Sequence, residues 1–588
     1  MKKRKFVFGL LVLMVCGITG YGVQEKSEKQ SPAATVRTET GQKLDDYLTR
    51  LEKFGFAGGI LVAKDGAVIL EKGYGLANRE QNIPNAVDTV FNIGSITKQF
   101  TAAAILKLEM QGKLRVEDPI NKYLPGVPKD KAGITIHHLL THSAGLRSDY
   151  AETDYEPVGR EEYIKRAMAE PLLSPPGEQF EYANSGYSLL AAIVELISGQ
   201  SYEQFLYDNL LKPAGMLHTG YCLPKWSPDK QARGYLDGRA WGTVVEKACV
   251  GEGPYWALRG NGGIQATVGD MYRWHQALEG NTILSAEARR KFQMPYIAEG
   301  PQGFSHYAYG WAIMKTPRGT KLVTHNGGNG IFAADFRRYV DENVVIFIAS
   351  NADVKAIPAS QQIARILFGM NPTFPPKVVE ADASKIAKLG GTYTLASGAK
   401  LAVAAKSDRL VISPEGQEAF SLLATGTPAV NPRLTEINTR TANLVEQASK
   451  GNFELIHQAF GGNIPLASVK ARETEMWKNW RERFGEFKGC TVLGTLPMEE
   501  RMATTARLTF ERGEILMRYA WEQGQLVGIR PLPQMTGKAF LPVSPTTFAI
   551  YDVMSGDTIT IRFETDAAGV ASKLIFAGEK EVTAKKTD

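Results

Sequence analysis

Short apolar runs near both ends of the first 370 residues predict the strands of one antiparallel sheet. Near the start, the runs at 59–63 and 67–71 are joined by Lys64-Asp65-Gly66, and Asp-Gly between two apolar runs is typical of a hairpin turn. Strand patterns return far along the chain, at 321–325, 330–339 and 344–350. We therefore expect the two ends of this region to meet in one sheet.

Between and beside these strands, apolar positions recur at helical spacing and are separated by Pro- and Gly-rich loops. Strands at both ends with helices in between are typical of a sheet that helices flank. The predicted helices lie near 43–54, 101–111, 187–197, 271–278 and 360–367.

The pattern changes after residues 371–377, where three prolines interrupt both periodicities and indicate a linker. Beyond it, short strand patterns alternate with Gly-containing turns, which is typical of a β-barrel or sandwich. Two helical patterns, at 434–448 and 476–487, interrupt the strands. The strand patterns lie at 506–510, 515–521, 525–529, 548–553 and 558–563.

The composition is that of a packed globular protein. Of 588 residues, 44% are hydrophobic and 22% are charged, which excludes disorder, collagen and coiled coil as the main architecture. The formal net charge is +6, but Lys2, Lys3, Arg4 and Lys5 supply four positive charges, so the rest of the chain carries only +2. No basic face for nucleic acid is expected.

The four cysteines, Cys16, Cys222, Cys249 and Cys490, are too few and too scattered for a zinc site or a disulfide framework. We predict no metal and no cofactor. In an exported protein Cys222 and Cys249 can pair and leave Cys490 odd, and a buried free thiol is an equal alternative.

The first residues have the pattern of an export signal, because the basic cluster precedes an apolar run at 6–15. We expect a signal peptide over 1–22, a flexible polar lead-in over 23–40, and a periplasmic or secreted protein. An uncleaved N-terminal membrane anchor is the alternative, which is disfavoured because a bilayer span needs roughly 20 apolar residues. Lipid attachment at Cys16 is also disfavoured, since Val15 stands where a small residue is expected.

Ser95-Ile96-Thr97-Lys98 is the first candidate for catalytic chemistry. A lysine three positions after a serine on a helix lies on the same face, so it can take the proton of a serine that attacks a carbonyl. A strongly helical stretch follows at 100–108, and both a helix N-terminus and burial lower the pKa of a lysine. Two further Ser-x-x-Lys sequences, at 227–230 and 397–400, lie in a Pro-containing loop and a Gly-interrupted strand region. Taken alone, such a motif is more often a solvated surface pair.

Two other motifs supply the groups that an active serine needs. In Tyr182-Ala183-Asn184, a phenol can share the proton of the serine and an amide can hold an amide of the substrate. In His325-Asn326-Gly327-Gly328, glycine lets a substrate approach the backbone, and the amides of Gly328 and Ser95 can donate to an oxyanion. His325 can donate a hydrogen bond to the substrate. A core tyrosine is the alternative for Tyr182, and we interpret His142 as structural.

In this order, the three motifs resemble those of the serine β-lactamase and penicillin-binding-protein superfamily, in particular its class C β-lactamase, D-alanyl-D-alanine carboxypeptidase and esterase branch. Ser95 to Lys98 is similar to its S-x-x-K motif, Tyr182 to Asn184 to Y-x-N, and His325 to Gly327 to H-x-G. The resemblance implies an α/β sandwich with an antiparallel sheet and a helical subdomain. It also implies that Ser95 is acylated, that Lys98 and Tyr182 move its proton, and that Asn184, His325, Gly327 and Gly328 bind the substrate.

The third motif departs from the lactamases of this branch, which usually have lysine where this chain has His325. Lysine is a fixed positive charge, whereas histidine is mostly neutral at pH 7. We expect an exported serine hydrolase that forms an acyl-enzyme on small molecules or peptides, namely D-amino-acid peptides, β-lactams or esters. The alternative is a penicillin- or cell-wall-peptide-binding protein that is not catalytic or releases its acyl group slowly.

The expected organisation is a hydrolase domain over 41–370, a linker over 371–384 and a mostly-β domain over 385–588. This last domain resembles, more weakly, the lipocalin-like barrels that are appended to some members of the branch. Gly390-Gly391-Thr392-Tyr393 is similar to the first strand of such a barrel. The sequence predicts no catalytic set there and no oligomeric state.

Overall fold

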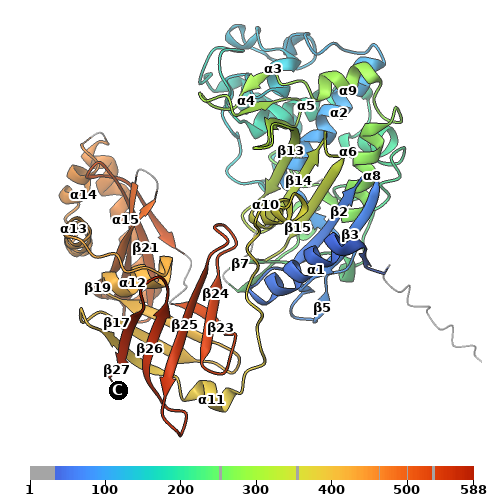
Figure 1. The fold of residues 1–588 in the computed structure, drawn as a ribbon. Coiled ribbons are helices and arrows are strands. Elements are labelled where there is room, and N and C mark those ends of the chain that lie inside the picture. Colours follow the sequence, from blue (N-terminus) through green and yellow to red (C-terminus); the bar gives the residue numbers. More distant parts are fainter. Residues whose placement is uncertain are drawn as a thin grey trace, which may run out of the picture.

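The structure is a computed structural model that describes residues 33–587 except 237, 251–253, 353–355, 463, 499–500 and 533–536. The predicted signal peptide, Cys16 and most of the predicted lead-in lie outside the described residues. Figure 1 shows two lobes joined by the segment that follows α10 (Ala356–Leu367). No helix of the described part is long and apolar enough to cross a membrane.

A nine-stranded antiparallel sheet is the centre of the first lobe, and it confirms that the two ends of this region meet. The hairpin of β2 (Gly58–Lys64) and β3 (Ala67–Tyr74) pairs with β15 (Val344–Ser350), so that Ile60 lies opposite Ile348. The remaining strands, from β15 outward, are β14 (Ala333–Tyr339), β13 (Lys321–Gly328), β12 (Ala312–Lys315), β11 (Ser305–Tyr307) and β10 (Ile297–Ala298).

Residues 35–40, predicted above as the end of the flexible lead-in, contain a strand and the start of a helix. Thr35 and Val36 form β1, which pairs with Glu71 and Leu70 on the outer edge of β3. Helix α1 (Thr38–Lys53) then begins five residues before the predicted helix. The polar composition of this stretch hid the strand, because an edge strand needs no continuous apolar run.

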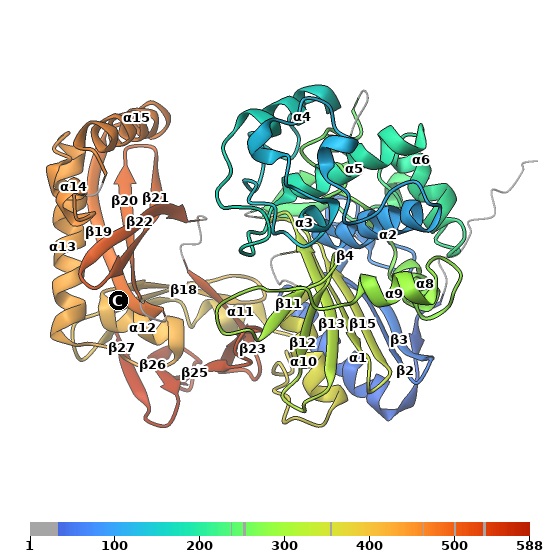
Figure 2. The same cartoon turned by 90° about the horizontal axis from the view of Figure 1, so that it is seen from above.

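Helices cover both faces of the sheet, as Figure 2 shows. On one face, α1 and α10 pack against buried strand residues such as Ile60 and Ile346. On the other face, α8 (Val268–Glu279) lies against β2 and β15, and α2 (Thr97–Met110) continues into the largest apolar core. The α/β sandwich predicted for this lobe is therefore confirmed.

A helical subdomain covers the end of the sheet at which α2 begins. Helix α2 packs against α5 (Asn184–Ser198), and α5 packs in turn against α3 (Ile136–Leu140) and α4 (Arg160–Ala169). Because α2 lies between sheet and subdomain, even its polar residues Thr97, Lys98 and Gln99 are fully buried. The Ser95–Lys98 motif thus lies at the junction of the sheet and the helical subdomain.

The second lobe contains the predicted barrel, which closes through eight antiparallel strands. Its apolar core includes Tyr393, Phe548 and Phe563. The strands are β16 (Gly391–Leu395), β17 (Lys400–Ala405), β18 (Leu410–Glu415), β23 (Lys538–Pro542), β24 (Thr547–Tyr551), β25 (Thr558–Thr565), β26 (Ala571–Ala577) and β27 (Val582–Lys586).

The strand patterns at 506–529 do not belong to the barrel. They form a separate four-stranded sheet inserted between β18 and β23, with its own core around Trp477 and Trp521. Period-two alternation shows that a strand has one buried face but not which core buries it. The inserted elements are α13 (Pro432–Ser449), α14 (Glu454–Ala459), α15 (Leu466–Phe484), β19 (Phe487–Met498), β20 (Arg501–Phe510), β21 (Gly513–Glu522) and β22 (Gln525–Leu532).

The predicted linker is extended, and it is held at three points rather than free. The Tyr551 hydroxyl of the barrel donates to the carbonyl oxygen of Thr373 at 3.1 Å, and the Arg50 guanidinium lies over the Phe374 ring at 5.3 Å. Arg50 also donates to the carbonyl oxygen of Pro375. The two lobes are therefore in contact through this segment, which ends at α11 (Ala383–Ala387).

Candidate active site

Ser95 lies in a single 3-10 turn, Gly94–Ile96, directly before α2. The turn packs so closely on the end of β13 that a side chain at Gly94 would collide with the amide nitrogen of Gly328, and one at Gly327 with the carbonyl oxygen of Ile93. Gly94 also has φ 52°, a left-handed conformation that favours glycine. Glycines on both segments thus let the serine turn and the strand end meet backbone to backbone.

Lys98 occupies the first turn of α2, and its side chain is fully buried. Its Nζ donates to the Ser95 Oγ at 3.1 Å, to the Asn184 Oδ1 at 2.8 Å and to the carbonyl oxygen of Asn261 at 2.8 Å. Burial lowers the pKa of Lys98 to about 7, although Asp154 and Asp149 partly oppose this shift. The amine is therefore poised between its neutral and charged forms near neutral pH.

Tyr182 and Asn184 flank the start of α5 and face the same lysine. Lys98 Nζ lies 4.8 Å from the centre of the Tyr182 ring. Burial raises the pKa of the Tyr182 phenol, and a hydrogen bond with Ser95 offsets only part of this rise. Tyr182 as a whole residue is 38% exposed, so the protein does not enclose it on every side.

His325 comes from β13 and is buried beside these groups, 6.5 Å from Tyr182 between ring centres. Its Nε2 hydrogen bonds with the Tyr307 hydroxyl at 2.9 Å, and its Nδ1 with the carbonyl oxygen of Asn326 at 2.6 Å. Burial, with a contribution from Lys98, lowers the pKa of His325 to about 4. The ring is consequently neutral at pH 7, and both of its nitrogens already have protein partners.

The structure thus brings together Ser95, Lys98, Tyr182, Asn184 and His325, with Gly327 and Gly328 against the serine turn. The chain also builds a small pocket at this place, lined in part by Asp154, Tyr155 and Asn261 in addition to Ser95, Asn184 and Gly328. The sequence motifs did not single out Asp154 or Asn261, because both come from loops without a recognisable spacing. Among the described residues, no group of three or more His, Cys, Asp or Glu side chains is placed to hold a metal ion.

His142, interpreted above as structural, lies directly under the site. Its ring packs at a tilt against that of Tyr182, and its Nδ1 accepts a hydrogen bond from the amide of Ala183 at 3.0 Å. Burial lowers its pKa far below the usual value, so the ring is a neutral acceptor. The side chain therefore fixes the loop that carries Tyr182.

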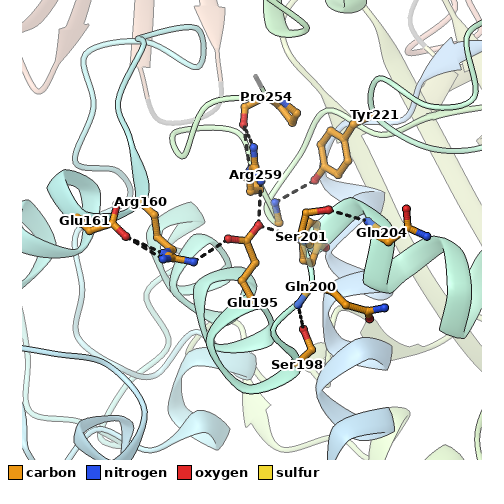
Figure 3. Close-up of polar contacts among 12 residues, drawn as sticks. Arg160, Glu161, Glu195, Ser198, Gln200, Ser201, Gln204, Tyr221, Pro254 and Arg259 are labelled. Atoms are coloured by element: carbon orange, nitrogen blue, oxygen red, sulfur yellow. Dashed lines mark hydrogen bonds and ion pairs between the residues drawn. The ribbon is translucent and has the colours of Figure 1, made fainter. Parts of the chain in front are cut away.

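Arg259 anchors the loop that carries Asn261 to neighbouring residues (Figure 3). Arg259 donates to the Glu195 carboxylate at 2.9 Å and twice to the carbonyl oxygen of Pro254. The second oxygen of Glu195 accepts from Arg160 at 3.0 Å. Because Asn261 accepts from Lys98, this ion-pair network supports one side of the lysine site.

Comparisons with known proteins agree with this geometry. A family model described as Beta-lactamase matches residues 44–368, which is more than half of the chain. The chain belongs to the beta-lactamase family. Membership in this family supports, in general terms, a serine hydrolase that works through an acyl-enzyme.

Relatives within this family carry the name penicillin-binding protein. One from Bacillus subtilis (strain 168) is 29% identical over 389 residues, covering 62% of this chain and 85% of that protein. The putative penicillin-binding protein PbpX of the same strain is 30% identical over 321 residues, covering 50% of this chain and 78% of that protein.

A solved structure extends the likeness of fold across both lobes. The octameric penicillin-binding protein homologue from Pyrococcus abyssi has a TM-score of 0.52 and 23% sequence identity, and the match covers 83% of this chain and 99% of that one. The combination of a β-lactamase fold with a further C-terminal part is therefore found in a solved protein.

Proposed function

We propose that this protein is an exported serine hydrolase in which Ser95 is acylated by small amide or ester substrates. The observation that carries the proposal is the 3.1 Å contact between the Ser95 Oγ and Lys98 Nζ in surroundings that lower the lysine pKa to about 7. A lysine with an ordinary pKa would be almost fully charged at neutral pH and could not act as a base.

The three hydrogen bonds of Lys98 explain how it can serve as that base. A charged ammonium has three protons, one for each of Ser95, Asn184 and Asn261. The neutral amine keeps two protons for the amide and carbonyl oxygens, and its lone pair then points at the Ser95 hydroxyl. Ser95 Oγ attacks the substrate carbonyl carbon while its proton passes to Lys98, with Tyr182 as the relay toward the leaving group.

The remaining groups bind the substrate and the developing charge. The amides of Ser95 and Gly328 lie where the serine turn meets β13, and we assign them to the oxyanion that forms on attack. Asn184 accepts from Lys98 through its oxygen, which leaves its NH2 group to donate to a carbonyl of the substrate. Protonation of the leaving nitrogen or oxygen breaks the scissile bond, and water then releases the acyl group from Ser95.

For the substrate we propose D-amino-acid peptides first, with β-lactams and esters as the close alternatives. His325 has a pKa of about 4 and both ring nitrogens engaged, so it supplies no fixed positive charge for a substrate carboxylate. This argues against efficient hydrolysis of substrates that carry a carboxylate beside the scissile bond, β-lactams included. We propose no nucleic-acid partner, and attachment to a membrane only through the N-terminal residues.

A second candidate function is a penicillin- or peptide-binding protein that is acylated but does not turn over. The names of the Bacillus subtilis relatives favour it. One experiment separates the two: a chromogenic ester and a chromogenic cephalosporin are assayed on the protein and on Ser95→Ala. Steady turnover that disappears in Ser95→Ala supports the hydrolase, a burst equal to the enzyme concentration supports the covalent binder, and no reaction with either substrate contradicts both.

A further inference from the structure

We infer that Asp154 selects substrates with a free amino group next to the scissile carbonyl. The inference rests on the proposed hydrolase function and adds the charge class of the substrate. Asp154 lies in the loop between α3 and α4, where no sequence motif of this chain singles it out, and it lines the same pocket as Ser95, Asn184 and Gly328.

Asp154 acts on the reacting groups through its charge. It is the largest of the charges that oppose the fall in the pKa of Lys98. In return Lys98 partly offsets the rise in the pKa of Asp154 that burial causes. Asp154 and Ser95 line the same pocket, so a substrate at Ser95 can meet the carboxylate.

Two other carboxylates act on this site, and in each of them protein donors already bind one of the two oxygens. Asp149 accepts hydrogen bonds from the Tyr163 hydroxyl at 2.9 Å and from two backbone amides. Glu299, which acts on Tyr182, accepts from the Ser305 hydroxyl. In the part of the chain that the structure describes, Asp154 accepts no such bond, so its oxygens are available to a ligand.

The positive charges around the pocket do not compensate for this acidity. His325 is neutral at pH 7, and Lys98 is only partly charged because its pKa is about 7. Lys247 is not among the residues that line the pocket; it is exposed and lies over the Trp241 ring at 4.6 Å. A pocket with a negative field attracts a cation and repels a carboxylate.

An α-ammonium group is the cation that best fits a site built around a carbonyl. It has a pKa of about 8 and is mostly charged at pH 7. A carboxylate accepting from it gives a charge-assisted hydrogen bond, which is worth about 10- to 100-fold in binding. Acyl groups of the aminoacyl type, with the amine unblocked, are therefore the expected substrates.

The test compares two substrates that differ only in the charge of that amine. D-alanine ethyl ester and N-acetyl-D-alanine ethyl ester are hydrolysed at pH 7 by the wild type, Asp154→Asn and Glu152→Gln, and the readout is the ratio of their kcat/KM values. Glu152 is the matched control, because it is an exposed carboxylate of the same loop. Substitution there removes an equal charge without touching the pocket.

We expect the wild type and Glu152→Gln to prefer the free amine, and Asp154→Asn to lower the ratio by at least about tenfold. An unchanged ratio in Asp154→Asn, or a wild-type preference for the acetylated ester, overturns the inference. If Asp154→Asn lowers kcat/KM equally for the two esters, the inference is also overturned, because Asp154 then acts only through Lys98. If the esters are hydrolysed in a Ser95-dependent way but without a preference for the free amine, the inference fails and the proposed function stands. If neither ester is hydrolysed in a Ser95-dependent way, both the inference and the proposed function are overturned.

Discussion

The imidazole of His142 lies against the phenol ring of Tyr182, with 4.2 Å between ring centres and 33° between the ring planes. Next to this contact, the Nδ1 of His142 accepts the amide proton of Ala183. His142 has φ 56°, in the left-handed region. The ring contact and the hydrogen bond together fix Tyr182, the residue that hydrogen bonds with Ser95.

Replacement of His142 by phenylalanine should keep a ring under Tyr182 but leave the buried amide of Ala183 without an acceptor. We expect a loss of about 1–3 kcal/mol in the free energy of unfolding, measured in urea, and slower acylation of Ser95. His142→Asn is the matched variant, since asparagine tolerates a left-handed backbone. If His142→Phe equals the wild type in both measurements, the histidine does not position the tyrosine.

The pKa of Lys98 predicts the pH dependence of the reaction. Because the neutral amine is the base, kcat/KM should be low at acid pH, rise tenfold per pH unit, and level off above a pKa of about 7. In Lys98→Ala this limb should disappear and the rate should fall by about 10²- to 10⁴-fold, while circular dichroism stays native. A limb centred near the ordinary lysine pKa of about 10 would contradict the assignment.

The ion pair between Arg259 and Glu195 is nearly buried, with 14% and 11% of the two side chains exposed. Arg259→Gln should destabilise the fold by about 3 kcal/mol, because Glu195 loses a buried partner. It should also lower kcat, because the loop that carries Asn261 loosens. Arg160→Gln removes the more exposed partner of Glu195 and should cost less than about 1 kcal/mol. Chemical unfolding of the two variants measures these losses of stability, and equal losses in the two would contradict a special role for Arg259.

A disulfide joins Cys222 and Cys249, which resolves the alternative left open by the sequence. Cys249 directly follows α7 (Val244–Ala248), and Val244 at the start of this helix lines the pocket of Ser95. The bond closes a loop over a separation of 27 residues, so replacing both cysteines by serine should cost about 3.5 kcal/mol of stability. Cys490→Ser is the control and should be near neutral. Thermal unfolding with and without reductant measures both effects.

Much of the first lobe follows from the sequence, because its signals are local. The Asp65-Gly66 turn has φ 52° and 78° and joins strands whose pairing is β2 with β3, as the apolar runs predict. Ser95 in the 3-10 turn and Lys98 in the first turn of α2 are only three positions apart, so their contact follows from spacing alone. Their meeting with Tyr182 and His325 is non-local, and it could be inferred only from the resemblance of the motif set.

The features that could not be predicted depend on contacts between residues that are far apart in the sequence. Asp154 is one carboxylate among many until the fold places it in the pocket that Ser95 lines, and the hydrogen bond of His325 Nε2 depends on Tyr307 in another strand. The same holds for the inserted sheet of the second lobe, whose strands alternate like those of the barrel. The prolines of the linker indicate an extended segment but not that Arg50 and Tyr551 hold it.

The central claim is that Ser95 is the residue that becomes acylated. It is tested most directly by reacting the protein with a slowly released acyl donor, such as an activated phenyl ester or a penicillin, and mapping the adduct by mass spectrometry of the digested protein. We expect one acyl group per chain on the peptide that contains Ser95, none in Ser95→Ala, and slow formation in Lys98→Ala. An adduct on another residue, or an undiminished adduct in Ser95→Ala, would contradict the account.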